Sequence, residues 1–348
     1  AADANIVYAC VSHFDTGSAV YTIWVSHDRG ATWTRAGTLP SGQQAQCEII
    51  IDSADAQKAI VNLYWYRPGA SPLQPNGLVF ATTDGGHSWT ALPGNYRYAQ
   101  MASYGGKVFV LRLDTPGAPD LGYRLMVSAD GMRTWTPLDQ TLADASATIS
   151  AFWLNPANGS ILAYAFSGSA RSFWSSPDRG GTWRRISVPT NGLLQTIAVQ
   201  WPLGAEPWRI CAAGQLINVA PVDEHNQLAC TLDGGKTWVD RPALDITLTC
   251  DCLKGRAFTS ISALNLVGIA PDGSLLATIL DRYDGDNPHV GLYRLPPTAT
   301  TWEPIGDASL NNSIFLLPSG VLWMSSSHPV NPASFWAPAS YVSTAAYP

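Results

Sequence analysis

The segment Asp281–His289 holds the densest group of chemically useful side chains in this sequence. It reads Asp-Arg-Tyr-Asp-Gly-Asp-Asn-Pro-His, so carboxylates, a guanidinium, a phenol and an imidazole share nine residues. Several carboxylates suit calcium, but the ligand spacing of a twelve-residue calcium loop is absent, and we predict no metal. A solvated Asp/Gly/Asn turn is the alternative. Asp281 and Asp284 are candidate catalytic carboxylates, and Arg282 and Tyr283 are candidate ligand contacts.

The tripeptide Asp223-Glu224-His225 is a second candidate. The chain has only four glutamates, so a Glu between an Asp and a His is unusual here. A carboxylate whose neighbours shift its pKa is suited to general acid and base catalysis. An exposed turn has the same composition, and that is the alternative. Asp223 and Glu224 join the candidate catalytic residues.

Arginine and aromatic residues form a third group. Aromatic rings beside Arg suit sugar rings and carboxylates, although many rings in such a chain serve packing instead. The sequence contains no His spacing typical of metal ligands, no Gly-x-Ser-x-Gly elbow, no phosphate-binding loop and no dinucleotide-binding motif, and we predict no cofactor. The further candidate ligand contacts lie in predicted loops and are Arg67, Arg97, Tyr98, Arg171 and Arg256.

The composition predicts that strands and turns position these residues. The 348 residues include four Lys and four Glu, against 22 Asp, 16 Arg, 30 Gly and 25 Pro. Lys and Glu are typical of exposed helices, whereas Asp, Gly and Pro favour turns. The net charge of −6 argues against a nucleic-acid partner, and no apolar run is long enough for a membrane span. The six cysteines fit either free thiols or one to three disulfides.

Five octapeptides repeat along the chain with the pattern Ser/Thr-x-Asp-x-Gly-x-Thr/Ser-Trp. Each lies between two apolar, strand-like segments, so each is predicted to be the turn of a β-hairpin. The Asp can accept hydrogen bonds from turn N–H groups, and the Gly tolerates a positive φ. The third copy has Met132 instead of that Gly, so we expect a distorted turn. The copies span residues 26–33, 82–89, 128–135, 176–183 and 231–238, with Asp28, Asp84, Asp130, Asp178 and Asp233 at the third position.

This repeat resembles the Asp box, or BNR repeat, of the sialidase-like β-propeller superfamily. Its members include sialidases, xyloglucan-active hydrolases, sortilin-type receptors and photosystem assembly factors. In these families the box lies between the third and fourth strands of each blade, on the face away from the active site. The resemblance therefore implies a structural role for the five box aspartates. It places the candidate residues on loops of the opposite face, and it implies an extracytoplasmic protein.

The catalytic residues of sialidases are not recognisable. The family carries a Phe/Tyr-Arg-Ile-Pro motif in its first blade, but the corresponding segment Asn5–Ser12 contains neither Arg nor Pro. The nearest match, Tyr293–Pro296, lies in a late predicted blade. A single propeller of this length also lacks the cleft between two propellers that xyloglucan-active relatives use. No catalytic residue is transferred from the family.

We predict an all-β fold, in which residues 1–348 form a single β-propeller domain. The span from Trp33 to Trp302 gives about 54 residues per blade and predicts six blades of four antiparallel strands, with seven as the alternative. In the six-bladed arrangement the C-terminal strands complete the N-terminal blade, which removes exposed sheet edges.

We expect a monomer that recognises a carbohydrate or other extracellular ligand at the axial mouth of the propeller. If it is an enzyme, we expect a glycoside hydrolase in which an Asp/Glu pair acts as acid and base or nucleophile. The alternative is a non-catalytic scaffold that binds a protein partner.

Overall fold

The computed structural model describes residues 5–15, 18–40, 46–66, 75–92, 98–113, 123–142, 147–167, 170–187, 193–201, 208–217, 224–253, 256–284, 287–308, 313–316, 322–326 and 339–342. The chain forms two compact units, Ala1–Ser187 and Val188–Pro348. Within the described residues the only helical element is the 3-10 helix η1 (Asp139–Thr141). The predicted all-β class is therefore confirmed. No helix in this part of the chain is long and apolar enough to cross a membrane.

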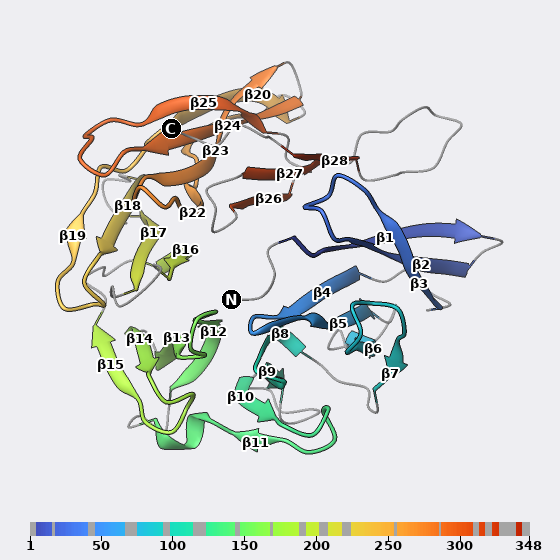
Figure 1. Cartoon of the computed structure of the whole chain (residues 1–348). Coiled ribbons are helices and arrows are strands. Elements are labelled where there is room, and N and C mark those ends of the chain that lie inside the picture. The colour runs from blue at the N-terminus through green and yellow to red at the C-terminus, as the bar shows by residue number, and fades with distance from the viewer. Residues whose placement is uncertain are drawn as a thin grey trace. The chain divides into compact units, whose positions relative to one another are not determined.

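The first unit consists of antiparallel sheets whose strands follow one another in sequence (Figure 1). Strands β1 to β3 form a three-stranded sheet, and β12 to β15 form a four-stranded one. Strands β4 to β7 and β8 to β11 are two further four-stranded meanders, joined where β4 runs parallel to β8. The bounds are β1 Val7–Asp15, β2 Ser18–Ser26, β3 Thr34–Pro40, β4 Gln46–Asp52, β5 Asp55–Tyr66, β6 Pro75–Thr82, β7 Thr90–Ala91, β8 Tyr98–Tyr104, β9 Lys107–Leu113, β10 Tyr123–Ser128, β11 Thr136–Pro137, β12 Thr148–Leu154, β13 Ile161–Ser167, β14 Ala170–Ser176 and β15 Arg184–Ser187.

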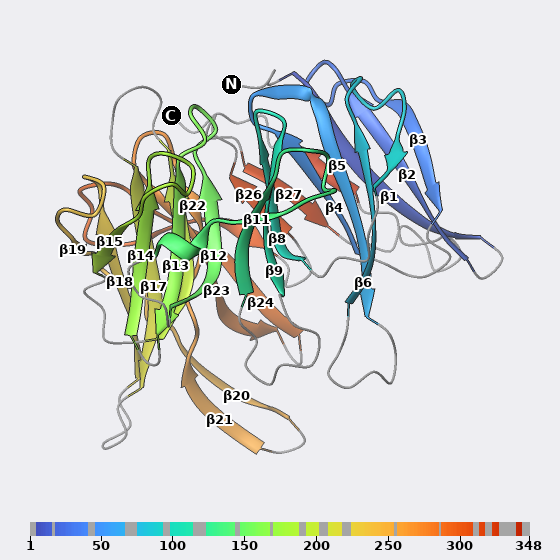
Figure 2. The ribbon, with the colours of Figure 1, turned by 90° about the horizontal axis from the view of Figure 1, so that it is seen from below.

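The second unit has the same organisation. Strands β16 to β19 and β22 to β25 form four-stranded meanders, and β26 to β28 pair with one another in a three-stranded sheet. The hairpin β20–β21 forms a separate two-stranded sheet, and Figure 2 shows it extending away from the other strands of the unit. The bounds are β16 Leu193–Gln200, β17 Arg209–Ile217, β18 Glu224–Thr231, β19 Val239–Asp240, β20 Thr247–Leu253, β21 Arg256–Ile261, β22 Asn265–Ile269, β23 Leu275–Asp284, β24 Asn287–Leu295, β25 Glu303–Ala308, β26 Ser313–Leu316, β27 Leu322–Ser326 and β28 Ala339–Val342.

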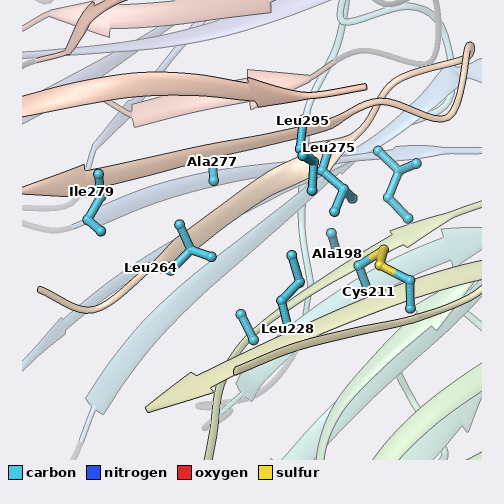
Figure 3. Close-up of a cluster of buried hydrophobic side chains, with 11 residues drawn as sticks. Ala198, Cys211, Leu228, Leu264, Leu275, Ala277, Ile279 and Leu295 are labelled. Carbon is cyan, nitrogen blue, oxygen red and sulfur yellow. A yellow bond between two sulfur atoms is a disulfide. The ribbon is translucent and has the colours of Figure 1, made fainter. Parts of the chain in front are cut away.

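Within each unit, successive sheets pack face to face through apolar side chains. In the first unit the sheet of β1 to β3 packs on β4 to β7, these strands pack on β8 to β11, and the latter pack on β12 to β15. In the second unit Leu228 and Ala198 meet Leu275 and Ile279 between the sheets β16–β19 and β22–β25 (Figure 3). Strands with both faces apolar are expected for such stacked sheets, because each interior sheet is covered twice.

Among the described residues, four cysteines form disulfides. Cys10 on β1 is bonded to Cys47 on β4 and so links two sheets. Cys211 and Cys230 lie directly opposite each other on β17 and β18, and their bond is buried in the apolar core of the second unit (Figure 3). Of the two alternatives that the sequence left open, free thiols and disulfides, these bonds favour disulfides. Disulfides form and persist in oxidising compartments.

The five octapeptides form turns with the same hydrogen bonds. In each one the first-position hydroxyl donates to Asp Oδ1 (2.7–2.9 Å). The N–H of the seventh residue donates to the same Oδ1 (2.8–3.0 Å). Its hydroxyl donates to Oδ2 (2.6–2.8 Å). The five aspartates thus act as structural acceptors, and their turns join β2–β3, β6–β7, β10–β11, β14–β15 and β18–β19.

The expected distortion of the third turn was wrong. Met132 adopts a φ of 67°, the left-handed region that Gly occupies in the other copies, and its N–H still donates to Ser128 Oγ at 2.9 Å. The Met132 side chain is fully buried between β4–β7 and β8–β11. Burial of this large apolar side chain offsets the backbone strain of a non-Gly residue at positive φ.

Two of the Trp residues that end a turn, Trp89 and Trp183, contact the preceding sheet. Trp89 belongs to the core shared with β1 to β3 and meets the Tyr8 ring edge-on, with centroids 6.4 Å apart. Trp183 donates its indole N–H to the Leu138 carbonyl at 3.0 Å. The sheet β22–β25 lacks the octapeptide but keeps this contact, because Trp302 donates to the Pro242 carbonyl at 2.8 Å. These three Trp residues therefore tie neighbouring sheets together.

A buried carboxylate joins the two meanders β4–β7 and β8–β11. Asp52, at the end of β4, is 1% exposed. It accepts hydrogen bonds from the Ser103 hydroxyl (2.9 Å) and from the backbone N–H groups of Gly105 (2.9 Å) and Gly106 (2.7 Å) in the β8–β9 turn. The N–H of Ala54 donates to it as well (2.9 Å). The carboxylate therefore fixes two turns against each other.

Replacing Asp28 by alanine is expected to lower the melting temperature by a few degrees at neutral pH, because turn donors lose their acceptor. Hydrogen bonds from Thr32 and Ser26 lower the pKa of Asp28 to about 2. A carboxyl whose pKa falls on folding stabilises the protein above its unfolded pKa, and loses this effect as the pH falls through the folded value. The deficit of Asp28→Ala should therefore be largest above about pH 4 and shrink toward pH 2. Thermal melts across this range measure it.

Asp240→Ala is the matched control, because Asp240 is an exposed aspartate on β19 outside the repeated turns. Its melting temperature should follow that of the wild type. An equal loss of stability in both variants would contradict a structural role specific to the turns.

Candidate functional site

Three polar side chains meet on one face of the sheet β22–β25. His289 Nδ1 lies 2.5 Å from Asp281 Oδ1, and the Tyr293 hydroxyl donates to Asp281 Oδ2 at 3.1 Å. The Asp281 and His289 side chains are 11% and 14% exposed. We call these three residues the Asp281 cluster. These exposures place Asp281 and His289 close to the surface. Tyr293 also packs on the apolar core of the second unit.

The strand geometry explains how residues twelve positions apart come together. His289 and Tyr293 alternate with intervening residues along β24, so their side chains share one face. Asp281 lies at a register shift in β23, where Leu280 pairs with Val290 but Arg282 already pairs with His289. A β-bulge of this kind re-aims a side chain, here toward the partner strand.

Gly291 leaves the space that the cluster fills. It lies between His289 and Tyr293 on the same face of β24. A Cβ atom at this position would lie 2.5 Å from Asp281 Oδ2 and 2.5 Å from a ring carbon of Tyr293. Any larger residue would therefore separate the carboxylate from the phenol.

The hydrogen bonds assign different roles to the three groups. A carboxylate oxygen can only accept, so of the two neutral His289 tautomers it favours the one that carries the proton on Nδ1 and the lone pair on Nε2. An imidazole held in this way can act as a general base or as a hydrogen-bond acceptor. Because both Asp281 oxygens accept hydrogen bonds within the cluster, its carboxylate serves to position the imidazole and the phenol.

The prediction that Arg282–Pro288 forms a loop was wrong. Strand β23 continues to Asp284 and β24 begins at Asn287, with Arg282 opposite His289, Tyr283 opposite Pro288 and Asp284 opposite Asn287. Antiparallel pairing therefore extends almost to the tip of the hairpin. Of the residues predicted in this segment, Asp281 lies in the cluster. The backbones of Arg282, Tyr283 and Asp284 follow it along β23.

The other predicted site residues are dispersed. Arg171 was expected in a loop but lies on β14 of the first unit, where its guanidinium stacks 5.2 Å from the centroid of the Phe166 ring. Glu224 opens β18, opposite Ile217, and is likewise not in a loop. Tyr98 and Arg256 are the first residues of β8 and β21 rather than loop residues. Asp223, Arg67 and Arg97 lie outside the described residues.

The described part of the chain contains no metal-binding site. No three or more His, Cys, Asp or Glu side chains there lie together as ligands of a metal ion would. The Asp281 cluster offers one carboxylate and one imidazole, and its third member is a phenol.

Sequence reasoning missed the importance of His289 and Tyr293 as a pair. The signal was the alternation His289-x-Gly291-x-Tyr293, which in a strand puts two polar side chains on one face with a small residue between them.

Comparison with known proteins supports the fold. No protein-family model and no curated protein matches the sequence. An oligogalacturonate lyase from Vibrio parahaemolyticus is similar in structure, with a TM-score of 0.52 and 9% identity over 82% of this chain and 76% of that one. YCF48 from Cyanidioschyzon merolae gives 0.51 and 11%, over 91% and 95%. An ulvan lyase of a polysaccharide lyase family gives 0.50 and 12%, over 95% and 90%. These proteins are β-propeller-like, and the likeness concerns the fold alone.

Proposed function

We propose that this protein binds carbohydrate outside the cytoplasm and that the Asp281 cluster contacts the sugar. The observation that carries the proposal is the single carboxylate that holds an imidazole and a phenol side by side, through contacts of 2.5 and 3.1 Å. Sugar hydroxyls both donate and accept hydrogen bonds. Rings whose orientation is already fixed bind them with less loss of side-chain entropy. Their apolar faces also suit the C–H surface of a sugar ring.

The remaining candidate residues extend this proposal. Arg282 follows the bulge in β23 and is proposed to bind the carboxylate of an acidic sugar. Tyr283 and Asp284 are proposed to line the same hairpin. The further proposed ligand contacts are Arg67, Arg97, Tyr98, Arg171 and Arg256, with Asp223 and Glu224 as additional acidic groups.

For the fold, we propose a single β-propeller domain of the Asp-box superfamily. Two observations support it: the five turns with identical hydrogen bonds, and the consecutive meanders that pack face to face. Among the described residues there are five four-stranded and two three-stranded meanders, with β20–β21 as an extra hairpin. This count favours seven blades over six. The two disulfides support an extracytoplasmic location. We propose a monomer.

Catalysis is the second candidate function. The predicted glycoside hydrolase needs two carboxyl groups, one as acid and one as base or nucleophile. Asp281 is occupied as an acceptor of hydrogen bonds, so within the cluster His289 is the group suited to act as a base. Two structurally similar proteins are, by name, a polysaccharide lyase and an oligogalacturonate lyase. Hydrolysis and elimination are therefore both to be tested.

A panel of neutral and acidic polysaccharides tests the proposal. Binding is measured by isothermal titration calorimetry, hydrolysis by new reducing ends, and elimination by the ultraviolet absorbance of unsaturated products. We expect saturable binding to at least one polysaccharide, weakened by His289→Ala and unchanged by Asp272→Asn. Asp272 is an exposed, hydrogen-bonded aspartate that precedes β23 at its other end, which makes it a matched control.

The competing function is a protein-binding scaffold. Absence of binding across neutral, uronate-containing and sialylated polysaccharides would contradict the carbohydrate proposal. Binding that is equally strong in His289→Ala would place the sugar elsewhere and contradict the role of the cluster.

A further inference from the structure

We propose that the turns β2–β3 and β14–β15 carry two equivalent sites for the anionic groups of an acidic polysaccharide. The Arg29 site consists of Arg29 and Arg35, and the Arg179 site consists of Arg179 and Arg185. All four arginines are exposed and belong to the first unit, whereas the Asp281 cluster belongs to the second. The choice of a polysaccharide rests on the proposed function, and the preference for an anion follows from the arginines themselves.

The two turns share a sequence pattern that is longer than the octapeptide. In both, Arg occupies the fourth position, a second Arg follows the final Trp by two residues, and another Trp precedes the first Ser by two residues. Strand pairing places the second Arg directly opposite that earlier Trp, with Arg35 opposite Trp24 and Arg185 opposite Trp174. The other three copies have Gly at the fourth position and no Arg at the later one. The arginine pair therefore distinguishes two turns from the rest.

The arginine at the fourth position adopts a backbone conformation that favours glycine. Arg29 and Arg179 both have a φ of 62°, in the left-handed region, and Gly takes this position in the other copies with φ values of 70–72°. Glycine adopts this conformation without steric cost, whereas any residue with a Cβ atom is strained. The turn itself therefore does not require arginine, and the strain points to a role for its side chain.

Both of these side chains are oriented by a hydrogen bond from Nε. Arg29 Nε donates to Asn5 Oδ1 at 2.8 Å, and Arg179 Nε donates to the Asn158 carbonyl at 3.2 Å. The Arg179 guanidinium also stacks 5.1 Å from the centroid of the Tyr104 ring. Neither arginine forms an ion pair with a described residue. Because Nε is held, the two Nη groups are already oriented to bind a carboxylate or a sulfate through paired hydrogen bonds.

The second arginine of each site is held on the strand that follows the turn. The Arg185 guanidinium lies 6.0 Å from the centroid of the Trp174 ring, and Arg35 Nη2 donates to the Thr38 hydroxyl. Side chains that are already oriented lose less conformational entropy when they bind a ligand. Each hairpin therefore presents two oriented guanidinium groups, which suits a chain with repeated anionic groups better than a single small anion.

The local charge favours an anion although the whole chain has a net charge of −6. Residues 148–187, which include β12 to β15, contain four Arg and one acidic residue, Asp178, and no Lys or Glu. Asp28 and Asp178 precede the first arginine of each site, but both carboxylate oxygens of each accept hydrogen bonds within the turn. A protein with a negative net charge does not attract polyanions as a whole, so their binding requires local sites of this kind.

Calorimetric titration of the full chain with dextran sulfate, polygalacturonate and neutral dextran tests the proposal. We expect saturable binding of at least one anionic polymer, weaker at higher salt, and no binding of dextran. The polymer that binds shows whether sulfate or carboxylate is preferred. The double variant Arg29→Gly/Arg179→Gly should weaken this binding by about tenfold or more. Since Gly is the residue of the other three turns, its melting temperature should stay within a few degrees of the wild type.

The matched control is the double variant Arg133→Gln/Lys236→Gln. These exposed cations occupy the sixth position of two other octapeptides, so the variant loses the same charge without touching either site. It should bind the anionic polymers within a few-fold of the wild type. An equal loss of affinity in both double variants would show a general effect of charge and overturn the proposal, as would a wild type that binds neither anionic polymer. His289→Ala should leave the binding of dextran sulfate unchanged, so this proposal and that of the Asp281 cluster fail separately.

Discussion

Replacing Asp52 by alanine should lower the free energy of unfolding by about 3–5 kcal/mol, because several donors lose one shared acceptor. The carboxylate is 1% exposed and accepts from the Ser103 hydroxyl and from the N–H groups of Ala54, Gly105 and Gly106. Water cannot replace it without opening the junction between the meanders. Urea unfolding followed by tryptophan fluorescence measures the loss.

Asp55→Ala provides the control for this prediction. Asp55 is close in sequence, but it forms an exposed ion pair with Lys58, and the two side chains are 41% and 43% exposed. Exposed pairs contribute less than about 1 kcal/mol. A loss for Asp52→Ala as small as that for Asp55→Ala would contradict the role of Asp52 as the junction between the meanders.

The second large effect is expected at the Asp281 cluster. His289→Ala should weaken carbohydrate binding by about 10–100-fold, since a hydrogen bond to a charged or strongly polarised group is lost. Gly291→Ala should have a comparable effect without removing any polar group, because its Cβ would lie 2.5 Å from Asp281 Oδ2 and so displace the carboxylate. Calorimetric titration with the polysaccharide selected by the panel measures both.

The Asp281→Asn variant separates the positioning of the His289 imidazole from the binding of carbohydrate. An amide that turns its NH₂ group toward His289 Nδ1 favours the opposite tautomer, with the proton on Nε2. If the site is catalytic, turnover should therefore fall more than affinity. Asp272→Asn should change neither. If Gly291→Ala and Asp281→Asn both bind and turn over like the wild type, the cluster has no part in function.

The sequence predicted the repeated turns more completely than the site. Each octapeptide is local, so the partners of the hydrogen bonds that all five turns share lie within eight residues: the first Ser or Thr, the Asp, and the Thr or Ser at the seventh position. Met132 shows the limit even there, because its positive φ depends on burial between two sheets. That packing involves strands far away in the sequence, which the octapeptide pattern alone does not describe.

The geometry of the Asp281 cluster depends on the register between β23 and β24, which the sequence pattern did not determine. Asp281 was identified from its polar surroundings, yet a loop was predicted where β23 and β24 remain paired. The bulge between Leu280 and Arg282 decides which residue of β23 faces His289. A shift of one residue would turn Asp281 to the opposite face of the sheet.

The most direct test of the proposed function is nitrogen-15 NMR of the His289 imidazole during titration with the oligosaccharide that binds best. The free protein should show a proton on Nδ1, held by Asp281. Binding should then shift the Nε2 resonance saturably, with the same Kd as the calorimetric titration. An imidazole spectrum that stays unchanged when the protein is saturated with carbohydrate would contradict the proposal that the Asp281 cluster binds the sugar.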